Sequence, residues 1–220
     1  MNIAFATVGA APEPEPIRAS AYAPTPGRAL FRVRGWLYVP FALFAVLWTH
    51  GEWEDDLVLW PLGLGVMAAG AWLRYSAIRR MGGAARTKKD SAKRLVTTGP
   101  YAWTRNPLYL ANLTAFAGFV ILCELPWFAA ISVLALGAAY HLIAHYEESV
   151  LAREFGREYE EYRARVPMWI PRRPVPVPAE DRSTLYPLAK ILVRERGALL
   201  NLSTLVALAA LKELVAHAPW

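Results

Sequence analysis

The chain has 220 residues, of which 55% are hydrophobic, and its mean hydropathy is positive at +0.23. A soluble domain of this size would not need apolar runs as long as those found here, so we interpret the chain as an integral membrane protein. Its net charge of +6 comes from Lys and Arg between the apolar runs, which favours cytoplasmic loops over a nucleic-acid surface. The single cysteine, Cys123, excludes an intrachain disulfide and a cysteine-based zinc site.

The N-terminal residues 1–30 contain five prolines among small side chains, which predicts a flexible arm. Their early apolar stretch is short and lacks a basic n-region, so we do not interpret it as a secretory signal. After the arm we expect a membrane core over residues 31–173. A Pro-rich connector with a basic segment is expected over 174–197, and a C-terminal helix over 198–220.

Five apolar runs follow the arm, at 36–48, 57–78, 107–123, 127–146 and 198–211. A membrane crossing needs about 20 residues, so only the second and fourth runs are long enough without their flanks. The last run contains Asn201, Ser203 and Thr204 and suits either a fifth crossing or an amphipathic helix at the interface. The sequence therefore predicts an all-α integral membrane helical bundle with four to five transmembrane helices.

Charge alternates between the loops that join these runs. Residues 79–94 and 153–173 are rich in Lys and Arg, whereas residues 51–56 and 124–126 contain none. This is the pattern expected when the N-terminus lies inside and basic side chains stay on cytoplasmic loops. We therefore expect an integral membrane protein whose N-terminus and basic loops face the cytoplasm.

A split motif flanks the third and fourth runs. Its first half lies within residues 99–109 and contains Gly99-Pro100-Tyr101, Arg105-Asn106-Pro107 and Tyr109. Its second half begins with Glu147-Glu148. The first half precedes the third run and the second follows the fourth, so both halves meet at one membrane face. This convergence predicts a cofactor pocket on the cytoplasmic side.

Glu147 and Glu148 end a predicted membrane helix, where a charged group favours a partner. One interpretation is an ion pair with Arg105 or a loop lysine that anchors the helix end. The other is a carboxylate that holds a cationic ligand in a dry pocket. Adjacent helical residues point about 100° apart, so we expect only one of the two to face the pocket.

Arg105-Asn106-Pro107 precedes the third apolar run, and Pro107 suits a first helical position, where its missing N–H costs little. Asn106 can cap this helix, whose free N–H groups can bind a carboxylate or phosphate. A plain helix cap with an interfacial arginine explains the same residues without a ligand. Tyr101 and Tyr109 fit either an adenine pocket or the aromatic belt of a membrane interface.

His141 and His145 are spaced i, i+4 in the fourth run, and that spacing can present two imidazoles to one metal. A membrane di-iron site would need several such pairs, and the chain has only four histidines, so we predict no metal. His145 lies near the glutamates and is a better candidate for proton handling.

Gly63-Leu64-Gly65 is a possible fragment of a glycine-rich nucleotide loop. It lies inside an apolar run and does not follow a strand, which argues against that function. Close helix packing through small residues, together with Ala69 and Gly70, is the better explanation.

Residues about 86–171 resemble the membrane methyltransferase superfamily of isoprenylcysteine carboxyl methyltransferases and phospholipid N-methyltransferases. The resemblance rests on the segments 95–101, 105–109, 147–151, 155–162 and 166–167. It implies a five-helix core or a close variant, with S-adenosylmethionine as cofactor. By position it implies cofactor contacts from Arg86, Lys93, Arg94, Leu95, Val96, Tyr101, Asn106, Pro107, Leu108 and Tyr109, with Glu147 or Glu148 at the cofactor's charged end.

Two positions depart from the isoprenylcysteine branch. Asn106 stands where those enzymes usually have His, and Ile143 stands where they place a substrate-binding arginine. The resemblance therefore implies a lipid or another lipophilic acceptor and argues against a prenylcysteine carboxylate.

Methyl transfer is an in-line displacement at a sulfonium carbon, for which proximity and alignment should supply most of the rate. A neutral acceptor would also have to lose a proton, for which His145 or the second glutamate is available. We therefore expect Glu147, Glu148, His145 and Arg105 to form the catalytic group. The alternatives are a sterol-type membrane reductase that uses NADPH and a non-catalytic relative. The acceptor and the oligomeric state are not predicted.

Overall fold

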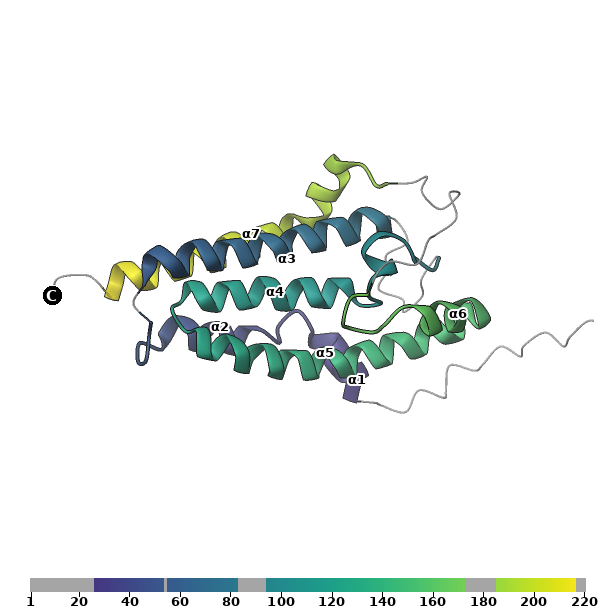
Figure 1. Ribbon diagram of the computed structural model, residues 1–220, viewed down its shortest axis with the longest axis horizontal. Coiled ribbons are helices and arrows are strands. Elements are labelled where there is room, and N and C mark those ends of the chain that lie inside the picture. Colours follow the sequence, from purple (N-terminus) through teal and green to yellow (C-terminus); the bar gives the residue numbers. More distant parts are fainter. Residues whose placement is uncertain (1–25, 54, 83–93, 173–184, 217–220) are drawn as a thin grey trace, which may run out of the picture.

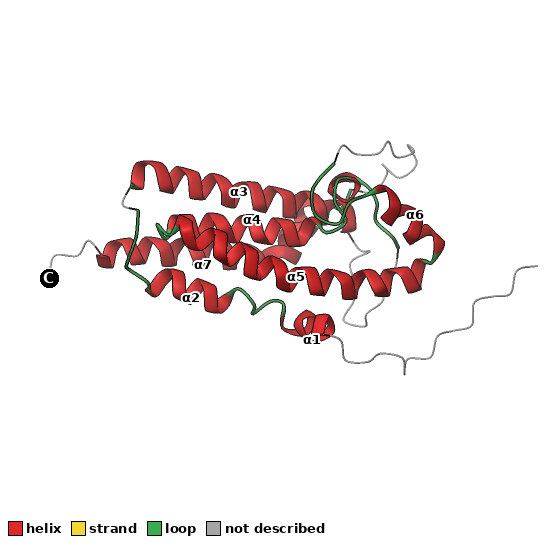
Figure 2. Cartoon of the chain, turned by 60° about the horizontal axis from the view of Figure 1, so that its bottom comes forward, coloured by secondary structure: helices red, strands yellow, loops and turns green. Residues whose placement is uncertain are grey.

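The computed structural model describes residues 26–53, 55–82, 94–172 and 185–216. The regular elements of these residues are all helical: α1 (Pro26–Val33), α2 (Val39–Leu47), α3 (Asp56–Met81), the 3₁₀ turn η3 (Gly99–Ala102), α4 (Pro107–Leu122), α5 (Pro126–Phe155), α6 (Arg157–Arg165) and α7 (Leu188–Ala216). The helices α3, α4, α5 and α7 run side by side along the long axis of the molecule (Figure 1, Figure 2). This arrangement confirms the predicted all-α bundle.

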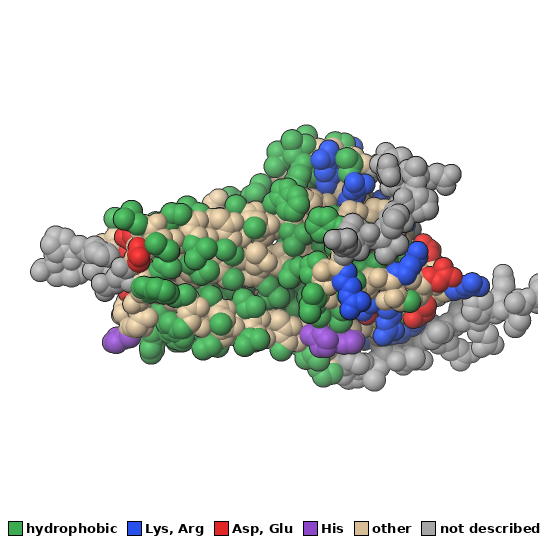
Figure 3. Space-filling view, in the orientation of Figure 1, with side chains coloured by type: hydrophobic (Ala, Val, Ile, Leu, Met, Phe, Trp, Pro, Cys, Tyr) green, Lys and Arg blue, Asp and Glu red, His purple; other side chains and the backbone are tan. Residues whose placement is uncertain are grey.

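Three helices are long and apolar enough to cross a membrane: α3, α5 and residues Glu195–Val215 of α7. The shortest of these has 21 residues and spans about 31 Å, close to the roughly 30 Å of a bilayer's hydrocarbon core. The helix α4 is also apolar but has only 16 residues. Large apolar side chains such as Leu57, Leu134 and Leu214 are exposed, and apolar side chains cover much of the bundle's length in Figure 3. The chain is therefore an integral membrane helical bundle.

The first predicted run, residues 36–48, does not form one long helix. It is divided between a turn and α2, whose nine residues extend only about 14 Å and do not cross a bilayer by themselves. Pro40 fits the first turn of α2, whereas inside a longer helix it would remove a backbone hydrogen bond. The preceding α1 packs on α5, with the rings of Phe31 and Tyr146 5.7 Å apart. A turn and one short helix thus stand where the sequence predicted the first crossing.

The helices α3 and α4 approach closely because their facing residues are small. A Cβ added at Gly70 would lie 2.5 Å from the backbone nitrogen of Ala115, and one added at Gly118 would lie 2.6 Å from the carbonyl oxygen of Gly63. Close backbone approach of this kind is typical of membrane helices. The packing prediction is confirmed for Gly63 and Gly70, whereas Gly65 faces open space.

The two ends of the bundle differ in charge. On the face seen in Figure 3, Lys and Arg side chains gather together with acidic ones at the end that carries α6, whereas the charged side chains seen at the opposite end are acidic. Residues 1–25 of the predicted arm 1–30, most of the basic loop (83–93) and residues 173–184 lie outside the described residues, and the last residues of the arm belong to α1. The helix α7 begins at Leu188 and so includes the last part of the segment expected to be a connector.

Candidate functional site

The two halves of the split motif lie against each other at the end of the bundle that carries α6. The backbone N–H of Arg105 donates to the carbonyl oxygen of Pro167 at 2.9 Å. The hydroxyl of Tyr162 on α6 donates to the carbonyl oxygen of Tyr101 in η3 at 2.8 Å. Segments that are distant in the sequence are therefore held together by direct hydrogen bonds.

A cavity of about 460 Å³ opens between these segments and the ends of α3, α4 and α5. Small-molecule sites usually measure about 300–1,000 Å³, so the cavity is large enough for a cofactor. Eleven of the predicted site residues line it: Arg94, Leu95, Val96, Tyr101, Arg105, Asn106, Pro107, Leu108, Tyr109, Glu147 and Glu148. The predicted contacts Arg86 and Lys93 lie outside the described residues. The structure describes His145 but does not place it in this lining.

Arg105 and Glu148 form a buried two-pronged ion pair in the wall of the cavity. Arg105 Nε lies 2.8 Å from Glu148 Oε1, and Arg105 Nη2 donates to Oε2 at 3.2 Å. The side chains are only 11% and 7% exposed, so little water screens the pair. Arg105 Nη1 also donates to the carbonyl oxygens of Arg163 and Val166 at 3.0 and 2.9 Å. One guanidinium thus joins α5 to the end of α6.

Glu147 precedes Glu148 on α5 and differs from it in burial. Glu148 is buried, with 6% of its surface exposed, whereas Glu147 is half-buried and borders the cavity. The difference follows from the helix, because adjacent residues point about 100° apart. The two glutamates therefore occupy different environments, one fixed on Arg105 and one at the cavity wall.

The first turn of α4 borders the cavity through residues 106–109. Pro107 is the first residue of the helix and Asn106 occupies the cap position, but the Asn106 side chain makes no capping bond. Its amide nitrogen instead donates to the carbonyl oxygen of Met168 at 3.4 Å, and the Thr104 hydroxyl donates to the same oxygen at 2.8 Å. The positive end of the α4 dipole, with its free N–H groups, therefore adjoins the cavity.

Two buried tyrosines of α6, Tyr159 and Tyr162, also line the cavity. Burial is the main cause that raises the pKa of both phenols well above the usual value. The negative charge of Glu148 acts in the same direction on the pKa of Tyr159. Both side chains consequently stay protonated and neutral at physiological pH.

A second ion pair lies deeper in the bundle, where the sequence analysis did not predict one. Arg74 on α3 donates from Nε to Oε2 of Glu195 on α7 at 2.7 Å, and from Nη1 to Oδ1 of Asn112 on α4 at 2.9 Å. Arg74 is the single charge in its apolar run, and such a residue in a membrane segment is a signal for a functional or structural partner. Its partner Glu195 is 121 positions away, and no local pattern indicates the pairing.

A second cavity of about 220 Å³ adjoins the first. The two share five lining residues: Arg34, Gly35, Arg74, Asn112 and Tyr140. Much of the rest of the second lining is small or apolar and comes from α3, α4, α5 and α7. The Tyr140 ring also stacks on Tyr109 with centroids 4.7 Å apart. The polar groups of Arg74 and Asn112 therefore stand at the junction between a polar and an apolar cavity.

His145 lies on the exposed face of α5, with its Nε2 3.1 Å from Nε2 of His141. The Trp169 indole N–H donates to His141 Nδ1 at 3.0 Å. Because Nδ1 accepts this bond, a neutral His141 carries its proton on Nε2 and donates it to His145. The geometry thus joins His145 to an exposed hydrogen-bond chain and not to the cavity.

Residues 59–158 match the phospholipid methyltransferase family. The predicted resemblance to membrane methyltransferases is confirmed. The chain is 32% identical over 138 residues to the nickel-cobalt-cadmium resistance protein NccN of Alcaligenes xylosoxydans xylosoxydans, which is 61% of each chain. It is 33% identical over 146 residues, 64% of each chain, to the cobalt-zinc-cadmium resistance protein CzcN of Cupriavidus metallidurans. It is 30% identical over 139 residues to the protein-S-isoprenylcysteine O-methyltransferase of Mus musculus, covering 61% of this chain and 48% of that protein.

The methyltransferase match runs from α3 to the start of α6. It includes the first half of the split motif and both glutamates and ends at residue 158, so Tyr162, Pro167 and Glu195 lie outside it. The chain spans less than two thirds of the length of NccN and CzcN and about half of the mouse protein. No solved structure matches the chain.

Proposed function

We propose that the chain is an S-adenosylmethionine-dependent methyltransferase that acts on a lipophilic acceptor, with its cofactor cavity on the cytoplasmic side of a bacterial inner membrane. One observation carries the proposal: every predicted cofactor residue in the described part of the chain lines the same cavity. The family match over residues 59–158 supports the same chemistry.

The lining suits the chemical groups of the proposed cofactor. Glu147 offers a carboxylate to a cationic centre, and the first turn of α4 offers N–H groups to a carboxylate. Tyr101 and Tyr109 offer aromatic faces on which an adenine ring can stack. An anion site, a cation site and an aromatic surface therefore lie within one cavity.

We assign different roles to the two adjacent glutamates. Both oxygens of Glu148 engage Arg105, so we propose that Glu148 is a positioning residue that holds Arg105 and, through it, the end of α6. Glu147 borders the cavity from the neighbouring position, and we propose that it contacts the cationic part of the cofactor.

For the acceptor, the second cavity is the natural place for an apolar group. It adjoins the first cavity, is lined mainly by small and apolar side chains, and lies among membrane-length helices. Ile143, at the position where the isoprenylcysteine enzymes have a substrate-binding arginine, is fully buried here. We therefore propose a lipophilic acceptor other than prenylcysteine.

When bound, S-adenosylmethionine supplies an electrophilic methyl group on a positively charged sulfur. The residues of the chain bind the cofactor and align the acceptor with its methyl group. Because transfer removes the positive charge, Glu147 should strengthen cofactor binding more than it lowers the barrier. Alignment of the acceptor at the junction of the two cavities should supply most of the rate. Tyr159 and Tyr162 stay neutral and so add no negative charge beside Glu147.

The test is calorimetric binding of S-adenosylmethionine to the full chain in detergent. We expect wild-type protein to bind and Glu147→Gln to bind roughly 10- to 150-fold more weakly, since a hydrogen bond to a charged group contributes about 1.5–3 kcal/mol. Glu154→Gln is the matched control, because Glu154 is exposed about two turns further along α5. It should bind like the wild type.

Three outcomes separate the alternatives. Folded wild type that binds NADPH and not S-adenosylmethionine would replace the methyltransferase with a reductase. Binding of neither would indicate a non-catalytic relative. Binding of S-adenosylmethionine, followed by transfer of its labelled methyl group into a membrane extract, would support the proposal and provide the acceptor for identification.

A further inference from the structure

The helix α7 is the most exposed of the membrane-length helices and is tied to the bundle at both ends. Only 11% of its apolar window is buried, compared with 22% in α3 and 39% in α5. Near its start, Glu195 pairs with Arg74 at the cavity. Near its end, Lys212 pairs with Glu52 of the loop between α2 and α3. The strength of these two ion pairs therefore determines how firmly α7 packs against the bundle.

Lys212 connects three parts of the chain at the end remote from the cofactor cavity. Its ammonium group lies 2.5 Å from Oε1 of Glu52 and donates to the carbonyl oxygen of Cys123 at 2.7 Å. The Lys212 side chain is only 6% exposed, so the loss of a partner would be costly. The hydrogen bond to Cys123 joins α7 to the loop between α4 and α5, and the ion pair with Glu52 joins α7 to the loop before α3.

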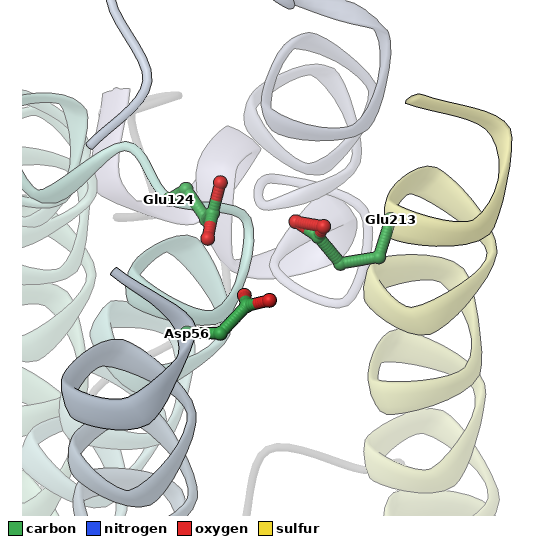
Figure 4. Close-up of side chains that lie close together, drawn as sticks. All are labelled: Asp56, Glu124 and Glu213. Carbon is green, nitrogen blue, oxygen red and sulfur yellow. The ribbon is translucent and has the colours of Figure 1, made fainter. Parts of the chain in front are cut away.

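Three further carboxyl groups surround this connection. Asp56 at the start of α3, Glu124 between α4 and α5, and Glu213 on α7 have oxygens within 4.8 Å of one another, and Figure 4 shows the side chains pointing toward a common centre. Glu124 is 3% exposed and has a left-handed backbone, with φ at 60°. The described residues thus place a group of three carboxyl groups beside the Lys212–Glu52 pair, with Glu213 next to Lys212 in the sequence and Glu124 next to Cys123.

A proton on one carboxyl group reduces the repulsion within this group of acids. Burial, then the hydrogen bond to Asp56, raise the pKa of Glu124 to about 7, and the charges of Glu213 and Glu52 act in the same direction. A raised pKa means that the packed state binds the proton more tightly than the open state. The stabilisation is therefore complete below the ordinary carboxyl pKa and is lost as the pH rises through about 7.

We name Glu52, Asp56, Glu124, Lys212 and Glu213 the acidic clasp. We propose that the acidic clasp is a proton-dependent latch that holds the end of α7 against the bundle when Glu124 is protonated and loosens it when Glu124 is ionised. Ionised Glu124 would face the negative charges of Asp56, Glu213 and Glu52, and the repulsion acts between groups on different elements. Because α7 also lines both cavities, the latch bears on the wall of the functional site.

The test is hydrogen exchange of the full chain in lipid nanodiscs, followed by mass spectrometry of peptides that cover residues 205–215. Rates are measured from about pH 5.5 to pH 8.5, corrected for intrinsic exchange, in buffer with EDTA so that no divalent cation replaces the proton. We expect wild-type protection to fall at least several-fold as the pH passes about 7. Glu124→Gln keeps the hydrogen bond without a titratable proton and should stay protected throughout.

Glu161→Gln is the matched control, because Glu161 is an exposed ion-pair residue on α6 and should leave the pH profile of α7 unchanged. Asp56→Asn provides a second variant if Glu124→Gln fails to fold. It should reduce the pH response, because it removes the negative charge of the carboxylate that is hydrogen-bonded to Glu124. A wild-type protection profile that does not change with pH would overturn the proposal. So would a pH response in both Glu124→Gln and Asp56→Asn that is as large as the wild-type response.

Discussion

Replacement of Glu148 by Gln is expected to destabilise the protein far more than replacement of its neighbour. The change leaves Arg105 charged, with an 11% exposed side chain and no carboxylate to meet its Nε and Nη2 groups. Removal of one partner from a buried ion pair typically costs about 3–5 kcal/mol. The remaining amide oxygen of Gln can still accept one bond, so we expect a value near the lower end, about 3 kcal/mol.

The measurement is the free energy of unfolding in detergent, compared for Glu148→Gln, Glu147→Gln and wild type. Glu147 is half-buried at the cavity wall, so its replacement should change the unfolding free energy by less than about 1 kcal/mol. The two variants should therefore separate stability from cofactor affinity: Glu148→Gln loses the first and Glu147→Gln the second.

A double-mutant cycle with Arg105→Gln tests the pair itself. If the two charges stabilise each other, the double variant should be less destabilised than the sum of the single variants, because neither charge is then left alone. Wild-type stability in Glu148→Gln, or strict additivity in the cycle, would refute the assignment of Glu148 to Arg105.

Three other changes test the packing around the site. Tyr162→Phe removes the hydrogen bond to Tyr101 O and should lower the unfolding free energy by about 1 kcal/mol. Gly70→Ala should cost about 1–3 kcal/mol by overpacking α3 against α4. Gly65→Ala, which faces open space on the same helix, should be neutral or stabilising in the same unfolding assay. The Cys123 thiol, whose pKa burial raises to about 12, should resist alkylation at pH 8 until denaturant is added, as mass spectrometry would detect.

The meeting of the two motif halves was predictable because it depends on helix count and direction alone. The lengths of the apolar runs and the charges of the loops are sufficient to predict that residues 99–109 and Glu147 lie at the same membrane face. The roles of Glu147 and Glu148 were not predictable, since they depend on how α5 is rotated against α4 and α6. The same rotation puts His145 on the exposed face, away from the cavity expected for it.

Ion pairs between helices that are distant in the sequence were also not predictable. Arg74 was visible as a lone charge in an apolar run, but Glu195 lies in a segment interpreted as a connector. The first run was misleading for a local reason, because Pro40 favours a helix that starts near Val39 and disfavours its extension back toward Trp36, despite an apolar composition. Composition measures how apolar a segment is, and only backbone geometry decides whether it continues as one helix.

The two ends of the bundle balance charge in different ways, and this bears on what each end can bind. At the cavity end, Glu148 and Glu195 each meet an arginine at hydrogen-bond distance, so these charges cancel in pairs. Glu147 lines the same cavity together with Arg34 and Arg94, so the lining presents both signs of charge to a ligand. At the far end, Lys212 pairs with Glu52 while Asp56, Glu124 and Glu213 lie together, and a proton on Glu124 reduces the repulsion among these three carboxyl groups. The cavity end thus balances its buried carboxylates with arginines, whereas the far end balances the group around Glu124 with a proton in the proposed latch, and α7 contributes a residue to each arrangement.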